Sequence, residues 1–324
     1  MVGSVFGLDG GCGLDALVWT SEDGRVWTRA EVPDDRCFHL TAMTHGADEY
    51  IAVGRDCDAT GRTTGVFWRS EDARHWELLG TAFLGTVYDE CVGVEGVGVT
   101  DAGIYLNART GNKHEVFRSP DGVDWERVSP RTFGVPPKPD DAPSGYWGGL
   151  LGTDMVQVDP TTVVLAGGCV NICPVTVWRS GDGFDWTELG RFEVNSALEV
   201  SIAVGPQIVL AVEPCDEDVS CGGEAVIWVL DDDGSLRETQ TIQMDSPNLA
   251  YAGDGYLLVG TATGSGQQVF VSPDGLEWTR SPADLVECRI RELIPGPSQV
   301  LVSTNGAFEG SDCDGLWLVD VRPA

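Results

Sequence analysis

The chain has 324 residues, of which 51 are acidic and 20 are basic, giving a formal net charge of −31. A field of that sign repels phosphate backbones and anionic lipid, which argues against nucleic acid and membrane surfaces as partners. No apolar run approaches the roughly 18 residues of a membrane span. The 42 glycines and the short apolar runs predict an all-β protein with many strands joined by tight turns.

One motif recurs along the chain: an aromatic residue, any residue, Ser, any residue, Asp, Gly, two further residues and Trp. Its five full copies contain Ser21, Asp23 and Trp27; Ser70, Asp72 and Trp76; Ser119, Asp121 and Trp125; Ser180, Asp182 and Trp186; and Ser272, Asp274 and Trp278. A worn copy follows Trp228, and Trp317 opens a strand that lacks the motif.

The physical chemistry of the motif predicts a turn. Ser and Asp side chains accept bonds from nearby backbone N–H groups, and Gly supplies the left-handed conformation that such a turn needs. The Trp opens the next strand and buries its ring against the repeat's core. The leading aromatics stand at 19, 68, 117, 178, 228, 270 and 317. A period of about 40–50 residues with short β segments indicates propeller blades.

These segments resemble Asp-boxes, the BNR repeats of sialidase-type β-propellers, over nearly the whole chain. The resemblance implies one propeller domain over 1–324, with seven four-stranded blades and six as the alternative. It also implies that each box joins the third and fourth strands of a blade, away from the ligand face, so that the box residues are structural. The expected repeats cover approximately 1–30, 37–80, 91–128, 147–190, 197–240, 248–280 and 288–320.

Single strands can be assigned in the second repeat. They are Cys37–Thr44, Tyr50–Gly54, Gly65–Ser70 and Trp76–Leu79. The first repeat has no room for its innermost strand, and the last one lacks its outermost. We therefore expect an incomplete first blade.

The ten cysteines indicate disulfides rather than zinc, because the chain has only four His and no Cys-x-x-Cys pair. Each lies at the start of a first strand or between a second and a third strand, which are at the same end of an up-and-down blade. The expected pairs are Cys12–Cys37, Cys57–Cys91, Cys169–Cys173, Cys215–Cys221 and Cys288–Cys313, with Cys37–Cys57 as a local alternative. Disulfides need an oxidising compartment, so we expect a secreted or cell-envelope protein whose signal or anchor segment lies outside this sequence.

The same end of the repeats carries the candidate ligand-binding residues, which are Arg36, Tyr88, Glu90, Arg109, Tyr146, Trp147 and Arg289. A proline-rich insertion at 129–147 ends in Tyr-Trp and suits sugar stacking or protein docking, although a strand start would bury Trp147 instead. A sialidase would need three arginines, a Tyr–Glu pair and an acid–base Asp. The family's Arg-Ile-Pro segment is missing ahead of the first box, so we assign no catalytic residue.

The acidic clusters Asp216–Asp218 and Asp231–Asp233 leave open a calcium ion bound by carboxylate oxygens. The second cluster lacks the Glu at loop position 12 of an EF-hand, and we assign no metal or cofactor. The predicted function is a non-catalytic, monomeric scaffold outside the cytoplasm that presents its disulfide-stapled face to a carbohydrate or a protein. The alternatives are a sialidase-like glycoside hydrolase and an assembly or stability factor.

Overall fold

The protein is described by a computed structural model. It describes residues 2–5, 17–20, 28–30, 39–45, 49–57, 62–86, 92–110, 113–133, 151–159, 161–169, 173–183, 185–192, 197–214, 223–231, 233–262, 266–281, 288–295, 299–306 and 315–320. For some of these residues, only the backbone is described.

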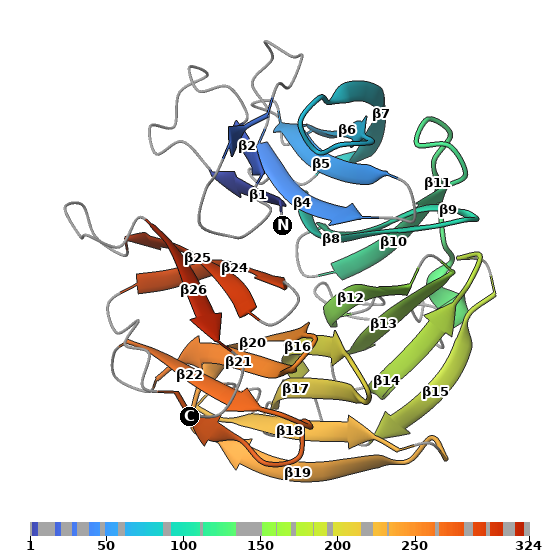
Figure 1. Ribbon diagram of the computed structural model, residues 1–324. Helices are drawn as coiled ribbons and strands as arrows, with labels where there is room; N and C mark the ends of the chain where they lie inside the picture. Colours follow the sequence, from blue (N-terminus) through green and yellow to red (C-terminus); the bar gives the residue numbers. More distant parts are fainter. Residues whose placement is uncertain are drawn as a thin grey trace. The chain divides into compact units, whose positions relative to one another are not determined.

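Consecutive strands pair antiparallel in seven hydrogen-bonded sheets within these ranges (Figure 1). The first three sheets contain β1 (Val2–Val5), β2 (Leu17–Thr20) and β3 (Thr28–Arg29); β4 (His39–His45), β5 (Tyr50–Cys57), β6 (Arg62–Ser70) and β7 (Glu77–Thr86); and β8 (Gly93–Thr100), β9 (Gly103–Thr110), β10 (Lys113–Ser119) and β11 (Glu126–Arg127). The next two contain β12 (Leu151–Asp159), β13 (Thr162–Cys169), β14 (Cys173–Ser180) and β15 (Thr187–Phe192); and β16 (Ala197–Val204), β17 (Ile208–Pro214), β18 (Ala225–Leu230) and β19 (Leu236–Ile242). The last two contain β20 (Asp245–Ala252), β21 (Gly255–Thr261), β22 (Gln267–Ser272) and β23 (Thr279–Arg280); and β24 (Cys288–Pro295), β25 (Gln299–Gly306) and β26 (Gly315–Asp320).

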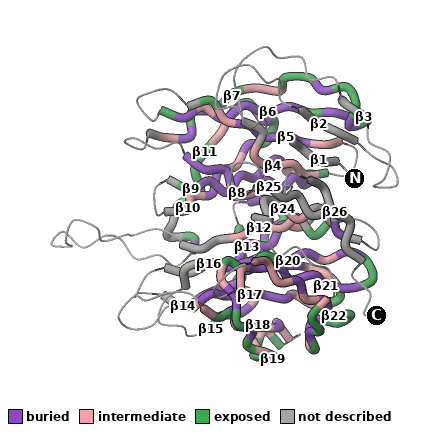
Figure 2. Tube along the Cα trace, turned by 90° about the vertical axis from the view of Figure 1, so that its left-hand side faces the viewer, coloured by how far each residue is buried: buried purple, intermediate pink, exposed green. Residues whose placement is uncertain are grey.

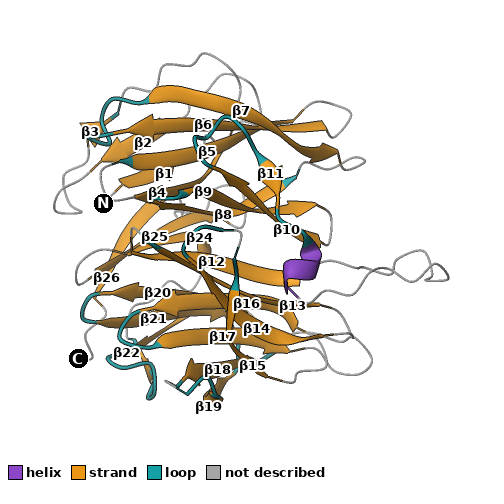
Figure 3. Ribbon diagram, turned by 90° about the vertical axis from the view of Figure 1, so that its right-hand side faces the viewer, coloured by secondary structure: helices purple, strands orange, loops and turns teal. Residues whose placement is uncertain are grey.

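The described part of the chain contains one helical segment, the 3-10 turn η1 (Pro130–Phe133; Figure 3). No helix in the described ranges is long and apolar enough to cross a membrane. The all-β prediction is therefore confirmed.

The first and last sheets have three strands each. Trp19 lies in β2 and pairs with Arg29 in β3, so the first sheet holds the second, third and fourth strands of a repeat. Trp317 lies in β26 and pairs with Val302 in β25, so the last sheet holds the first, second and third. The described residues thus agree with the predicted irregular ends. Seven as the number of blades stays a prediction.

The chain forms two compact units, which we describe separately. The first comprises Met1–Leu150, Asp154–Leu165 and Trp178–Thr187, and the second comprises Leu151–Thr153, Ala166–Val177 and Glu188–Ala324. The single domain over 1–324 stays a prediction.

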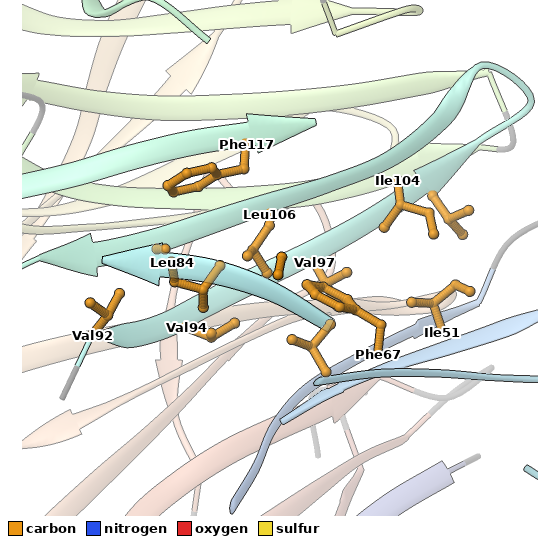
Figure 4. Packing of buried hydrophobic residues seen from close by; sticks show 13 residues of the cluster. Ile51, Phe67, Leu84, Val92, Val94, Val97, Ile104, Leu106 and Phe117 are labelled. Carbon is orange, nitrogen blue, oxygen red and sulfur yellow. The ribbon is translucent and has the colours of Figure 1, made fainter. Parts of the chain in front are cut away.

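Within each unit the core lies between neighbouring sheets. In the first unit Ile51, Phe67 and Leu84 pack against Leu106 and Phe117 of the next sheet (Figure 4). In the second unit, a similar cluster joins β17 and β18 to β20 and β21. Because each inner sheet has neighbours, its second strand is covered on both faces, and its outer strand is the most exposed. Figure 2 shows this gradient, from the buried run in β17 to the mostly intermediate and exposed residues of β19.

The outer strand β7 differs from its predicted bounds of Trp76–Leu79 and continues to Thr86. Two register shifts allow this: Trp68 pairs with Leu78 and Phe67 with Gly80, so that Leu79 is an extra residue, and Leu84 is skipped in the same way between Phe83 and Gly85. The extra residue at Leu79 shifts the alternation of the residues that follow it. Beyond it, Ala82 and Leu84 are buried, at 8% and 3% exposed, whereas Phe83 between them is 55% exposed.

Candidate functional site

The antiparallel order gives each sheet two different ends. At one, which we call the box end, the motif turn joins the third strand to the fourth, as between β6 and β7. At the other, which we call the loop end, the first strand begins, the second ends and the third begins, as with β4, β5 and β6. Two of the candidate ligand residues predicted from the sequence lie at this end in the described part of the chain, Arg109 in β9 and the backbone of Arg289 in β24.

Four box turns lie in the described ranges, apart from Phe184 in the third, and two hydrogen bonds recur in all four. In the turn after β10, the Ser119 hydroxyl donates to Asp121 Oδ1 (3.1 Å), which also accepts the N–H of Val123 (2.9 Å) and of Asp124 (3.0 Å). The Trp125 indole N–H donates to the carbonyl of Gly122 at 3.0 Å. The turns of Ser70, Ser180 and Ser272 share the Ser–Asp bond and the indole bond.

These bonds define what the box carboxylates can do. The backbone N–H groups of Asp124 and Val123 hold the pKa of Asp121 below its usual range. The pKa of Asp72 is also lowered, first by the His75 side chain and then by backbone N–H groups. Both carboxyls therefore stay ionised as acceptors and are unsuited to donate a proton near neutral pH. The predicted box of Ser21, Asp23 and Trp27 lies outside the described residues.

The position directly after the box Asp packs against the preceding sheet. Gly122, Gly183 and Gly275 have positive φ angles of 76°, 70° and 80°. A Cβ on Gly183 would overlap the ring of Tyr105, which belongs to β9 of the preceding sheet. The turn therefore needs glycine both for its backbone angle and for the contact between sheets.

The worn copy after Trp228 builds a different turn. Leu230 replaces the motif serine, and the backbone closes the hairpin itself, with Gly234 N–H on the Asp231 carbonyl and Asp231 N–H on the Ser235 carbonyl, both at 2.9 Å. Asp233 accepts the N–H and hydroxyl of Ser235. Asp231 and Asp233 are thus used in a hairpin turn, and Asp232 lies outside the described residues. No group of three or more His, Cys, Asp or Glu in the described residues is arranged to hold a metal ion.

At the loop end, a side chain of the second strand is hydrogen-bonded to the backbone of the next sheet. In two sheets this side chain occupies the same position of the strand. Arg55 lies three residues after Ala52, the partner of the box aromatic Trp68. Its Nη1 donates to the carbonyl of Val92, just before β8 of the next sheet, at 3.0 Å. The N–H of Val92 donates to Thr63 Oγ1 at 2.9 Å, so both backbone groups of Val92 are bound by the preceding sheet.

Glu213 is the equivalent residue of β17, three beyond Leu210, the partner of Trp228. Its Oε2 accepts the N–H of Ser246 in β20 of the next sheet at 2.9 Å. Asp245 also accepts the N–H of Gly223. An arginine and a glutamate thus make the same connection, the first to a carbonyl and the second to an N–H.

Glu213 has the raised pKa of a proton donor, but its side chain is not accessible to a substrate. Its pKa is raised, first by burial and then by the charges of Glu199 and Asp245. A carboxyl with a raised pKa beside ionised carboxylates is typical of glycosidase acid–base pairs. However, Glu213 is only 2% exposed and is bonded to the backbone of Ser246. This geometry assigns Glu213 to the connection between sheets.

Arg109 occupies the same position of β9, three residues beyond Leu106, the partner of Phe117. It is exposed at the loop end, and His114 is its cross-strand neighbour. Burial and then the charge of Arg109 lower the pKa of His114 to about 4, so this imidazole is neutral at physiological pH. The pair therefore presents a permanent positive charge beside a neutral ring.

Arg109 is the one predicted ligand residue whose side chain is described. The backbone of Arg289 lies in β24, where it pairs with Asn305. Outside the described residues lie Arg36, Tyr88, Glu90, Tyr146 and Trp147. Sequence reasoning did not single out Arg55, Thr63, Glu213 or Asp245, since their roles depend on the neighbouring repeat.

The cysteines are described only in part. The backbone positions of Cys57, Cys169, Cys173 and Cys288 lie at strand ends, and Cys169 and Cys173 lie at the facing ends of the adjacent strands β13 and β14. Outside the described residues lie Cys12, Cys37, Cys91, Cys215, Cys221 and Cys313, as does the acidic cluster Asp216–Asp218. The five predicted pairs stay predictions.

No family model and no curated protein matches the sequence. Solved structures do match. A proposed 6-phosphogluconolactonase from Bacteroides uniformis has a TM-score of 0.59 and 11% identity, over 99% of this chain and 96% of that one. The α-L-arabinofuranosidase Arb93A from Fusarium graminearum has a TM-score of 0.50 and 11% identity, over 87% and 93%. An acylaminoacyl peptidase from Pyrococcus horikoshii has a TM-score of 0.51 and 12% identity, over 87% of this chain and 44% of that one.

The fold is a β-propeller. The repeated four-stranded meanders are its blades, and the structural matches extend over nearly the whole chain. At identities of 11–12%, these matches establish the propeller architecture alone.

Proposed function

We propose that this propeller is a non-catalytic binding scaffold of the Asp-box type, which presents the loop end of its blades to a carbohydrate or protein ligand outside the cytoplasm. The observation that supports this most is the contrast between the two ends of the blades. In the four described boxes, the Ser and Asp side chains are used by their own turn. At the loop end, the Arg109 side chain is exposed to solvent beside His114.

A cationic side chain suits either class of ligand. A guanidinium offers five N–H donors in a fixed plane, which match sugar hydroxyls, a sugar carboxylate or an acidic protein group. The neutral His114 beside Arg109 adds no competing charge.

One observation favours the glycosidase alternative. Arb93A is an arabinofuranosidase solved with an iminosugar inhibitor, so this fold accommodates glycoside chemistry in that protein. The buried Glu213, the carboxyl that comes nearest to a general acid in the described residues, argues against catalysis because substrate has no access to it. We therefore keep binding without turnover as the proposal. An assembly factor would use the same face for a protein partner.

A glycan array of the oxidised protein, with and without calcium, tests the proposal. We expect binding to one glycan class, reduced at least tenfold by Arg109→Ala, since a charge-assisted bond contributes about 1.5–3 kcal/mol. Arg127→Ala is the matched control, because Arg127 is an exposed arginine of the same sheet. It lies on the outer strand β11 and forms an ion pair with Glu115.

The outcomes separate the candidate functions. Hydrolysis of the bound glycan would establish the glycosidase alternative. Equal binding by both arginine variants would remove Arg109 from the site. An array without any binding would exclude the carbohydrate proposal and leave a protein ligand, to be sought by cross-linking at position 109.

A further inference from the structure

The start of β8 is held by the preceding sheet through both backbone groups of one residue. Val92 donates its N–H to Thr63 Oγ1 at 2.9 Å, and its carbonyl accepts Arg55 Nη1 at 3.0 Å. Its side chain is fully buried in the core between the two sheets. Three contacts of different kinds therefore hold Val92 against the β5–β6 end of its neighbour.

These contacts bring two sequence positions together. Cys57 is the cross-strand partner of Thr63, and opposite residues in an antiparallel pair have Cα atoms about 4.5–5.5 Å apart. Cys91 is the residue before Val92 in the chain, so their Cα atoms are about 3.8 Å apart. The hydroxyl of Thr63 that binds Val92 thus connects the neighbour of one cysteine to the neighbour of the other.

We propose that Cys57 and Cys91 form a disulfide that covalently joins the loop end of the β4–β7 sheet to the first strand of the β8–β11 sheet. The bond needs Cα atoms about 4.4–6.8 Å apart. The pairing of Cys57 with Thr63, together with the hydrogen bond from Val92 to Thr63, brings the sequence neighbour of Cys91 to the residue opposite Cys57, which supports this pair. This inference concerns a covalent link and stands independently of the ligand-binding proposal.

The chemistry is a thiol–disulfide exchange. The Cys57 and Cys91 thiols lose two protons and two electrons, one S–S bond forms, and a small disulfide oxidant of the glutathione class is reduced to two thiols. In the sequence, the bond closes a ring of the chain from Cys57 to Cys91, which includes Tyr88 and Glu90. The same offset, from the loop of one repeat to the first strand of the next, relates Cys12 to Cys37.

Tryptic peptide mapping without reduction, after free thiols are alkylated, gives a direct test. Cleavage after Arg55 and Arg62 isolates Cys57 in peptide 56–62, and cleavage after Arg74 and Arg109 isolates Cys91 in peptide 75–109. Each peptide has a single cysteine, so a mass equal to their sum minus two hydrogens identifies the bond. We expect this linked species in the protein as purified, and its loss on reduction.

Three results would overturn the proposal: peptide 56–62 linked to peptide 37–55, peptide 56–62 linked to peptide 1–25, or both cysteines recovered in alkylated form. Variants supply a second readout. Cys57→Ser and Cys91→Ser should each lower Tm by about 3–8 °C, and the double variant should lower it no further. Additive losses in the double variant would contradict a shared bond, and so would unequal losses that persist in reductant.

Discussion

At the scale of single residues, the position directly after the box Asp shows how a turn and a packing contact can both require glycine. Three of the four described boxes have glycine there, and the fourth has Ala73 with φ of 60°. Ala73 is itself buried, in a cluster with Trp68 and Trp76. Its methyl group is thus tolerated because the neighbouring side chains leave room, not because the backbone angle differs.

Gly183→Ala should therefore destabilise the protein far more than its backbone angle alone requires. A left-handed angle costs a non-glycine residue about 1–2 kcal/mol, and the clash with Tyr105 adds about 1–3 kcal/mol of overpacking. Gly223→Ala is the matched control, since Gly223 has φ of 90° and a Cβ there would meet nothing within 4 Å. Denaturant midpoints measure both. Equal losses would show that the contact with Tyr105 is unimportant.

Glu213 gives a prediction for pH. Its pKa is raised in the folded state, so ionisation at neutral pH costs stability, and this cost disappears as pH falls below the carboxyl's ordinary range. Glu213→Gln keeps an acceptor for Ser246 N–H and removes the charge. We expect the variant to have the higher Tm at pH 7 and the difference to vanish in acid. The exposed Glu277→Gln is the control. A variant less stable than the parent at pH 7 would show that the charge itself is needed.

At the scale of elements, β7 shows what alternation in the sequence cannot reveal. The strand contains two extra residues, Leu79 and Leu84, and each shifts the side chains that follow it to the opposite face. A period-two reading therefore fails here, and the predicted strand ended too early. The bulges also twist an outer edge away from straight strand pairing, which is one way in which sheets avoid edge-to-edge association.

The β7 register predicts opposite outcomes for adjacent substitutions. Leu84→Ala should cost about 2–4 kcal/mol of unfolding free energy, because Leu84 fills the core between two sheets. Phe83→Ala should cost less than about 1 kcal/mol, since Phe83 is exposed and makes one contact with the Arg62 guanidinium, 4.7 Å from its ring centroid. Chemical denaturation of both variants measures this. A larger loss at Phe83 would mean that β7 has the unbulged register.

At the scale of the whole molecule, the fold could be predicted because the motif is local. Ser, Asp, Gly and Trp form a turn by themselves, so five copies in sequence already give the repeat, the strand order and the structural role proposed for the box. The connections between sheets could not be predicted in this way. Thr63 and Glu213 act on backbone atoms of the next repeat, and nothing in their own sequence neighbourhood marks them. Arg109 could be proposed from the sequence because a charged residue at a strand end is visible there, and its role as a ligand residue stays a prediction.

The hydrogen bonds of Arg55 and Glu213 with the next sheet affect which substitutions this chain can accept during evolution. Both side chains bind the backbone, which offers a carbonyl and an N–H at every non-proline residue whatever the sequence. A substitution that reverses the charge at this position therefore needs no compensating substitution in the neighbouring repeat. Lineages of this protein could replace basic residues with acidic ones, one repeat at a time, and reach a strongly acidic composition while each blade stayed attached to the next.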